Sequence, residues 1–216
     1  MSLSKIFSFV LVIILSFSSY IQTFATETIK ISTSQNQMQV EKDKRLAERQ
    51  ALKIARSKPK FKDGIWIVWK DIQPGTYRTK RKSNSCYYSR VSGFGWTIKE
   101  IIANEFTNSP AIVTIDASDK WFISKNCGVW TQDLSKITRN INSFSDGTFI
   151  IGTDISSWTY QSSGGNGCYY VRMKNFLGNI NSIISNEFTN EPSIVTIDVT
   201  DAGFKSNNCG TWKKID

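Results

Sequence analysis

The chain has 216 residues with a formal net charge of +9, and it contains no histidine. The absence of histidine excludes Ser-His-Asp and Cys-His catalysis and every site that needs an imidazole. Residues 27–60 and 61–133 carry the basic excess, whereas residues 134–216 are neutral overall. An anionic partner such as a cell-wall polymer would therefore meet the N-terminal part of the chain.

The first 25 residues have the pattern of an export signal peptide. Lys5 supplies the positive end, an apolar run extends from Ile6 to Phe17, and Thr23-Phe24-Ala25 offers a cleavage site. The apolar run is short for a membrane span, and an uncleaved N-terminal anchor is the alternative. We expect a secreted, periplasmic or extracellular protein, which argues against nucleic acid as a partner.

Residues 26–60 are predicted to form a polar spacer followed by a short basic helix. Between Gln37 and Arg56, apolar residues recur at helical spacing among Glu, Lys and Arg, and Pro59 marks the end of the pattern. Such a helix could contact an anionic membrane surface. A solvated stalk is the alternative that we favour, because large anchoring side chains are missing.

The rest of the chain contains one unit twice. Cys86 to Trp130 returns as Cys168 to Trp212, and more than half of the aligned positions are identical. The repeat predicts two small domains at residues 61–133 and 144–216, joined by a linker at 134–143.

Each repeat is predicted to be all-β. Phe61 and Phe144 open the repeats, and each leads through a turn-forming Asp-Gly into a β-prone run. A Cys-Tyr-Tyr-x-Arg strand and an Ile-Val-Thr-Ile strand follow, while residues 98–103 suit a short helix or a strand equally. Five or six short strands without a long helix favour a small β-sandwich or barrel-like domain.

The four cysteines form one pair in each repeat, each enclosing about 40 residues. Zinc would need closely spaced ligand pairs, so we predict the disulfides Cys86–Cys127 and Cys168–Cys209, with pairing across the repeats as the alternative. No metal or other cofactor is expected.

The arginine of the Cys-Tyr-Tyr-x-Arg strand lies on the same face as the cysteine. If that face is the core, Arg90 and Arg172 need carboxylate partners, and the candidates are Asp71 and Asp154 or Asp119 and Asp201.

Together these motifs resemble an uncharacterised family of exported bacterial modules. Its members carry Gly-x-Tyr-x-Val-Gly-x-Asp-Ile-x-Pro-Gly-x-Tyr, then Cys-Tyr-Trp-x-Arg, Val-Thr-Ile and Cys-Gly-Thr-Trp. The resemblance covers nearly all of both repeats and implies secretion and a β-rich fold rather than an activity. Trp69 replaces a family glycine in the first repeat, and Ser157-Trp158 replaces Pro-Gly in the second.

No residue is predicted to be catalytic. Asp116 and Asp119, with their copies Asp198 and Asp201, could offer calcium ligands, but we interpret them as turn-capping residues. Glu105 and Glu187 are predicted to lie in loops.

Aromatic residues that occur in both repeats are predicted to be core: Tyr77/Tyr160, Tyr87/Tyr169, Tyr88/Tyr170, Phe94/Phe176, Phe122/Phe204 and Trp130/Trp212. Four tryptophans instead stand opposite glycine in the other repeat: Trp69, Trp96, Trp121 and Trp158. Emptying a core position from Trp to Gly costs several kcal/mol, so these four are predicted at the surface or in loops. They could bind sugars, choline-like cations or a protein, or pack over a local loop.

A run of basic residues, which the second repeat lacks, precedes Cys86. It comprises Arg78, Lys80, Arg81 and Lys82 and is predicted to form a loop that recognises an anionic polymer or is simply solvated. The sequence thus predicts a secreted, non-catalytic module that binds an anionic cell-wall polymer, a polysaccharide or a protein. A carboxylate-based polysaccharide hydrolase and an extracellular interaction or inhibitor protein are the alternatives.

Overall fold

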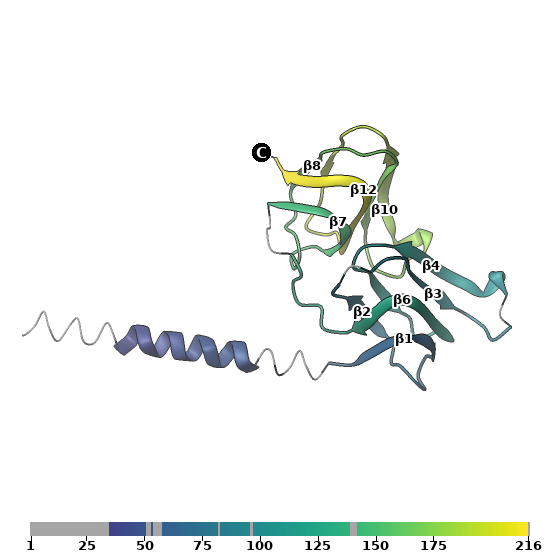
Figure 1. The fold of residues 1–216 in the computed structure, drawn as a ribbon, viewed down its shortest axis with the longest axis horizontal. Coiled ribbons are helices and arrows are strands. Elements are labelled where there is room, and N and C mark those ends of the chain that lie inside the picture. Colours follow the sequence, from purple (N-terminus) through teal and green to yellow (C-terminus); the bar gives the residue numbers. More distant parts are fainter. Residues whose placement is uncertain are drawn as a thin grey trace, which may run out of the picture. The chain divides into compact units, whose positions relative to one another are not determined.

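The computed structural model describes residues 35–50, 53, 58–81, 83–95, 97–138 and 142–215. A helix occupies residues 35–50, which confirms the helical prediction over this part, and it belongs to one of two units, residues 1–54. Residues 55–216 form the second unit and contain both repeats (Figure 1). The predicted signal peptide and most of the spacer lie outside the described residues. None of the described helices is long and apolar enough to cross a membrane.

The first repeat is one curled antiparallel sheet of six strands. Its strand order is β4-β3-β6-β2-β5, and β1 pairs with β6. A short 3-10 helix at Ile98–Glu100 precedes β4, so the ambiguous segment contains both a helical turn and a strand. The strands are β1 Lys60–Ile67, β2 Gly75–Thr79, β3 Cys86–Val91, β4 Ile101–Thr107, β5 Ile112–Ile115 and β6 Trp121–Thr131.

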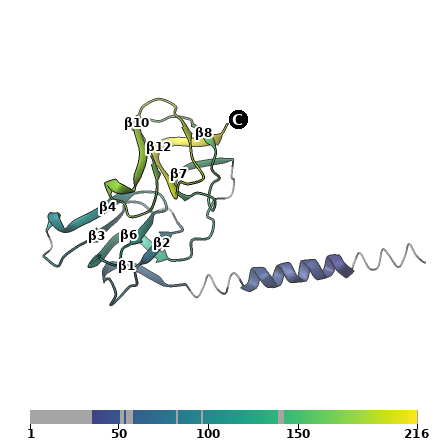
Figure 2. The ribbon, with the colours of Figure 1, turned by 180° about the vertical axis from the view of Figure 1, so that it is seen from behind.

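The second repeat has the same topology, in the order β10-β9-β12-β8-β11 with β7 paired to β12 (Figure 2). A 3-10 helix at Ile180–Ser182 precedes β10. Each repeat is therefore a half-barrel, which is the barrel-like form of the predicted fold. The strands are β7 Ser143–Ile150, β8 Thr159–Ser162, β9 Cys168–Met173, β10 Ile183–Thr189, β11 Ile194–Thr196 and β12 Gly203–Lys214.

The Asp-Gly pair that opens each repeat is a bulge within a strand, not the predicted turn. The register of β1 against β6 shifts between Lys62 and Gly64. The Asp63 carboxylate accepts hydrogen bonds from the backbone N–H groups of Cys127 at 3.0 Å and Gly128 at 2.8 Å. Asp146 does the same in the second repeat. The aspartate thus holds the bend of the long central strand, where the ladder itself is interrupted.

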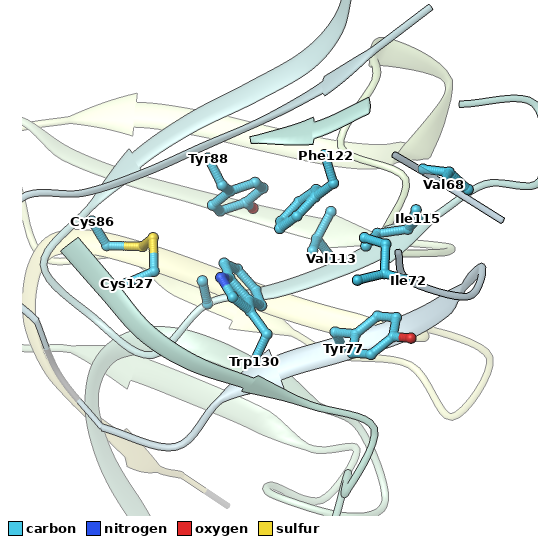
Figure 3. Close-up of a cluster of buried hydrophobic side chains, with 11 residues drawn as sticks. Val68, Ile72, Tyr77, Cys86, Tyr88, Val113, Ile115, Phe122, Cys127 and Trp130 are labelled. Carbon is cyan, nitrogen blue, oxygen red and sulfur yellow. A yellow bond between two sulfur atoms is a disulfide. The ribbon is translucent and has the colours of Figure 1, made fainter. Parts of the chain in front are cut away.

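Each core combines one disulfide with a group of aromatic rings. Figure 3 shows the core of the first repeat. The bonds Cys86–Cys127 and Cys168–Cys209 are both present, as predicted, and all four sulfurs are used within their own repeats. Phe122 meets Trp130 edge to face at 5.2 Å, and the copies of these two residues in the second repeat meet at the same distance. Such pairs add stability beyond the burial of their area.

Most of the shared aromatic residues lie in these cores, but two predictions need correction. Phe94 is 56% exposed and its copy Phe176 is only half-buried and lies outside the core cluster. Tyr87 and Tyr169 are half-buried because they lie on the opposite face of the strand from Tyr88 and Tyr170. Glu105 and Glu187 lie in strands β4 and β10, not in loops.

The two arginines of the cysteine-bearing strands pair with the second set of predicted partners. Arg90 Nε and Nη2 donate to Asp119 at 2.7 and 2.8 Å, and Arg172 makes the same two contacts with Asp201. Bidentate pairing of this kind compensates a buried guanidinium. Asp119 Oδ2 also accepts from the backbone of Asp116, so the aspartates of this segment hold a turn, as the sequence predicted.

Candidate functional site

Trp69 is exposed in a turn of the first repeat. Its side chain is 61% exposed, and its φ of 73° lies in the left-handed region that Gly152 adopts at the equivalent position with a φ of 77°. This backbone requirement explains why the second repeat carries glycine here. Trp69 Nε1 donates to the Ala117 carbonyl at 2.9 Å, which holds the ring over the neighbouring turn.

Trp158 is 45% exposed in the second repeat. Its Nε1 donates to the Ile215 carbonyl at 2.7 Å, and the Lys214 ammonium lies 3.6 Å from the centre of the ring. One face of the indole is therefore already covered by a cation of the same chain.

Trp121 is partly buried and meets Phe94 edge to face at 5.2 Å. At the equivalent position, Gly203 leaves room for the ring of Phe176, whose atoms approach to 2.5 Å from where a Cβ would stand. The space of a tryptophan in one repeat is thus filled by a rearranged phenylalanine in the other. Trp69, Trp121 and Trp158 contact three different segments, and Trp96 lies outside the described residues.

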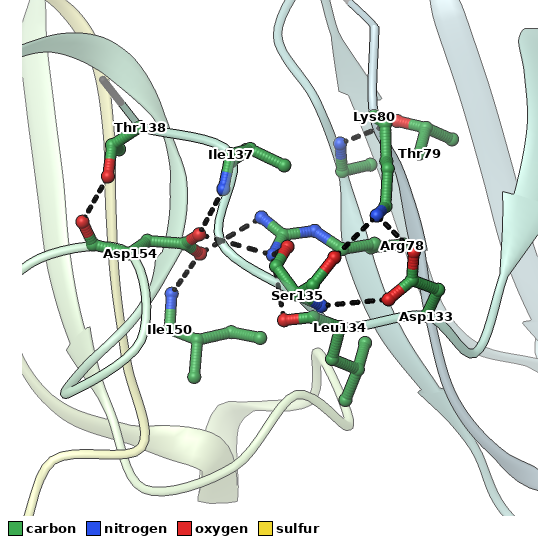
Figure 4. Close-up of polar contacts among 11 residues, drawn as sticks. Arg78, Thr79, Lys80, Asp133, Leu134, Ser135, Ile137, Thr138, Ile150 and Asp154 are labelled. Atoms are coloured by element: carbon green, nitrogen blue, oxygen red, sulfur yellow. Dashed lines mark hydrogen bonds and ion pairs between the residues drawn. The ribbon is translucent and has the colours of Figure 1, made fainter. Parts of the chain in front are cut away.

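Arg78 corrects the prediction of a basic surface loop. It lies in strand β2, its side chain is fully buried, and Nη2 donates to the Asp154 carboxylate of the second repeat at 2.9 Å (Figure 4). Asp154 also accepts from the backbone N–H groups of Ile137 and Ile150 at 3.0 and 2.8 Å. Arg78 therefore joins the two repeats and is not available to a ligand.

Lys80 and Arg81 are the described members of the basic run that solvent reaches, and Lys82 lies outside the described residues. Lys80 Nζ contacts the Asp133 carboxylate and Ser135. Burial alone would raise the pKa of Asp133, but hydrogen bonds from Lys80 and Ser135 outweigh it and lower the pKa to about 2. Lys60 and Arg81 line a pocket with Lys80 and Val129. Within the described part of the chain, no carboxylate lies within ion-pair distance of Lys60 or Arg81.

The outer strands of the first half-barrel are bridged by a loop from the second repeat. This loop, residues 174–179, connects β9 to the 3-10 helix and is called the docking loop below. Its Phe176 carbonyl accepts a hydrogen bond of 2.8 Å from the Thr114 N–H on β5. Its Leu177 carbonyl accepts from Arg90 Nη1, the nitrogen that Asp119 leaves free.

Apolar contacts accompany these two hydrogen bonds. Gly178 approaches β4 so closely that a Cβ there would lie 3.3 Å from the Ala103 Cβ. Ala103 is 8% exposed and Ile112 is 4% exposed, and both line a small pocket with the docking loop. We call Arg90, Ala103, Ile112 and Thr114 the covered edge. An ion pair of 3.2 Å between Lys205 and Glu105 adds to this contact between the repeats.

The same four positions in the second repeat are Arg172, Ser185, Ile194 and Thr196, and we call them the open edge. Ile194 is 60% exposed and Ser185 and Thr196 are also exposed. The Arg172 side chain is 22% exposed, compared with 3% for Arg90. Among the residues that the structure describes, none accepts a hydrogen bond from Arg172 Nη1.

The register of β11 leaves backbone groups unpaired at the open edge. Thr159 and Thr196 lie opposite each other with their Oγ1 atoms 3.0 Å apart, as Thr76 and Thr114 do at 2.8 Å. A pair in this register directs its N–H and C=O groups away from the partner strand. The Thr196 N–H therefore points outward. The equivalent Thr114 N–H also points outward, and it donates to the Phe176 carbonyl of the docking loop.

A tyrosine lies behind each edge, and both are 5% exposed. Burial, together with the nearby Glu105 carboxylate, raises the pKa of Tyr88 well above its usual value. Burial and a hydrogen bond to Glu187 raise the pKa of Tyr170 to about 12. Both tyrosines therefore remain protonated hydrogen-bond donors at neutral pH.

Neither edge could be predicted from the sequence, because the residues concerned are nearly the same in both repeats. Arg, Ile and Thr recur at three of the four positions, and only Ala103 differs, as Ser185. What distinguishes the edges is the presence of a neighbouring repeat, which is a property of the tertiary arrangement.

Structural contacts with arginine, lysine, tyrosine or backbone N–H groups engage five of the described carboxylates, those of Asp63, Glu105, Asp119, Asp154 and Asp201. No group of three potential metal ligands occurs among the residues described.

Comparison with known proteins places the chain in a family. No curated protein and no solved structure matches it. Residues 58–131 and 142–213, however, each match the Rv1352-like extracellular domain, which confirms the resemblance to an exported, β-rich module. The two disulfides accord with an oxidising, extracytoplasmic compartment. The chain therefore belongs to the Rv1352-like extracellular domain family and carries two tandem copies of that domain.

Proposed function

We propose that the protein is a secreted, non-catalytic binding protein, and that its open edge binds a segment of another extracellular protein chain. The observation that supports this proposal is the contrast between the two edges. The covered edge holds a peptide segment in place, while the open edge has the same arginine, isoleucine and threonine and none of the described segments on it.

The covered edge indicates the chemistry of the segment. It would present two successive main-chain carbonyls, one to the Thr196 N–H and one to Arg172 Nη1, and a small or apolar residue to Ile194. Addition of a peptide to a sheet edge is a common mode of recognition, in which backbone hydrogen bonds supply affinity. The pKa of Arg172 is raised by its hydrogen bonds to Asp201, so the guanidinium remains charged. It can therefore make a charge-assisted hydrogen bond to a carbonyl.

A displayed peptide library panned on the oxidised protein tests this function. Peptides should be enriched on the wild type and on the control Val199→Asp, which alters an apolar residue that is 79% exposed in the same repeat but outside the edge. Binding of the enriched peptides should fall at least tenfold on Ile194→Asp. Failure to enrich any peptide, or equal binding to Ile194→Asp, would contradict the proposal.

A second function is supported by the pocket beside the basic run. Lys60, Lys80 and Arg81 line it, and Lys80 alone among them pairs with a carboxylate. This arrangement supports contact with an anionic wall polymer, which requires uncompensated cations. Retention on purified wall polymer should decrease with salt and be reduced in the double variant Lys60→Gln/Arg81→Gln. Retention that both salt and this variant leave unchanged would count against polymer binding.

A further inference from the structure

The docking loop has a copy in the first repeat, and the described residues of that copy contact neither edge. Residues 92–97 connect β3 to the 3-10 helix as residues 174–179 connect β9 to its own helix. Both loops are closed by the same backbone hydrogen bonds, from Ser92 N–H to the Glu100 carbonyl at 2.8 Å and from Lys174 N–H to the Ser182 carbonyl at 3.0 Å. Among the described residues, the loop of repeat 1 therefore has no edge to bind, and the open edge of repeat 2 has no loop bound to it.

Residues 92–95, which we call the free loop, present the main-chain carbonyls that an edge binds. The carbonyls of Phe94 and Gly95 correspond to those of Phe176 and Leu177, which accept hydrogen bonds from the covered edge. The Phe94 side chain is 56% exposed, whereas Phe176 is half-buried.

The free loop is also held in shape before any contact. Gly95 N–H donates to the Glu100 carboxylate at 3.0 Å, and a Cβ on Gly93 would clash with the same carboxylate. A loop that is already ordered loses less conformational entropy on binding than a flexible one.

We propose that the segment bound by the open edge is loop 92–95 of a second copy of this chain, so that the protein associates head to tail. This inference rests on the proposed role of the open edge as a peptide-binding site. The contact is heterologous, because it joins repeat 1 of one chain to repeat 2 of the next. Each further chain therefore presents a new open edge, and the assembly grows as an open chain unless its rotation closes a ring.

The contact between chains differs from the contact within a chain at three places. Trp96 and Ser185 stand where Gly178 and Ala103 meet so closely that a Cβ on the glycine would lie 3.3 Å from the alanine Cβ, so this end of the loop must lie further from the open edge. Two polar interactions are also missing. Ile123 stands where Lys205 pairs with Glu105, and Gln161 stands where Arg78 pairs with Asp154. The repeats of one chain also benefit from a linker, which raises their effective concentration to about the millimolar range. We expect the association to be weaker than the contact within the chain and to depend on protein concentration.

Sedimentation velocity of the oxidised, exported chain, measured up to about 1 mM, which is the scale of the linker's effective concentration, provides the test. The wild type and the control Val199→Asp should increase in mean mass with concentration. The loop of Phe94→Asp should no longer bind an edge, and the edge of Ile194→Asp should no longer bind a loop. Each variant should therefore remain a monomer. An equimolar mixture of these two variants still has one intact loop and one intact edge. It should therefore form a heterodimer and nothing larger.

The mixture distinguishes this assembly from a symmetric dimer or from association through another surface. A wild type that stays monomeric at every concentration would overturn the proposal, as would a mixture that stays monomeric or association that survives both substitutions. Peptide binding at the open edge of a chain that never self-associates would overturn self-assembly and leave the proposed function intact. Loss of self-association together with unchanged peptide binding in Ile194→Asp would instead refute the proposed function.

Discussion

Replacement of Asp154 by alanine should strongly destabilise the contact between the repeats. Arg78 and Asp154 are both fully buried, and the carboxylate accepts four hydrogen bonds, two from the guanidinium and two from the backbone. Removal of one partner of a buried pair leaves an uncompensated charge and costs about 3–5 kcal/mol. The free energy of unfolding should fall by this amount.

Asp71→Ala is the matched control because Asp71 occupies the same position in the first repeat. Its carboxylate accepts a hydrogen bond from Ile67 N–H at 3.0 Å, as Asp154 does from Ile150 N–H, but it is exposed and pairs with none of the arginines that the structure describes. We expect a cost of about 1 kcal/mol, the usual net value of one hydrogen bond. The difference between the two variants therefore measures the contacts that Asp154 makes with Arg78 and Ile137.

Guanidinium unfolding of the oxidised protein, followed by circular dichroism, gives both free energies. The double variant Arg78→Met/Asp154→Leu should recover most of the loss, because a buried ion pair can be replaced by apolar residues of similar size at little cost. The reasoning is refuted if Asp154→Ala is no more destabilising than Asp71→Ala, or if the double variant is as unstable as the two single losses combined.

Three further predictions concern single features of the repeats. Replacement of Cys86 and Cys127 by serine should lower the free energy of unfolding by roughly 4 kcal/mol, since the bond closes a loop of about 40 residues; urea unfolding without reductant measures this, and a loss below about 1 kcal/mol would contradict it. The pair of Lys80 with Asp133 should stabilise the fold above about pH 4 and lose its effect as the pH falls through about 2, because the folded pKa lies below its usual value of 3.8. Wild type should therefore exceed Asp133→Asn in stability by no more than about 1 kcal/mol at pH 6 and by less at pH 2, where the folded carboxyl is half protonated; a difference as large at pH 2 as at pH 6 would be inconsistent with the pair. Asp119→Asn should cost more stability than Asp201→Asn, because the arginine partner of Asp119 is 3% exposed and that of Asp201 is 22% exposed; equal losses in thermal unfolding would argue against a difference between the two edges.

The sequence predicted those parts of the fold that repeat locally. The cysteine spacing predicted both disulfides, and the period-two pattern of Cys-Tyr-Tyr-x-Arg placed Tyr88 and Arg90 on the buried face. The Asp63-Gly64 pair, in contrast, did not reveal a bulge, because an Asp-Gly pair suits a turn and a bulge equally well.

The comparison of the two repeats was informative about exposure but could be misleading about roles. It placed Trp69 and Trp158 at the surface, whereas Trp121 is partly buried because Phe176 fills the corresponding space in the other repeat. Because the second repeat lacks the basic run, the run is predicted to be a loop that recognises an anionic polymer or is solvated, but at Arg78 the difference marks a contact between the repeats. A contact that joins two copies leaves an asymmetric signal in sequence, which resembles that of a ligand site.

Amide hydrogen exchange of two threonines tests the central claim most directly. At low protein concentration, where chains do not meet, the Thr114 N–H should exchange slowly because it donates to the Phe176 carbonyl across the covered edge. The Thr196 N–H should exchange rapidly from the open edge. Equal protection of Thr114 and Thr196 in the monomer, or rapid exchange of both, would show that the two edges do not differ as the structure indicates.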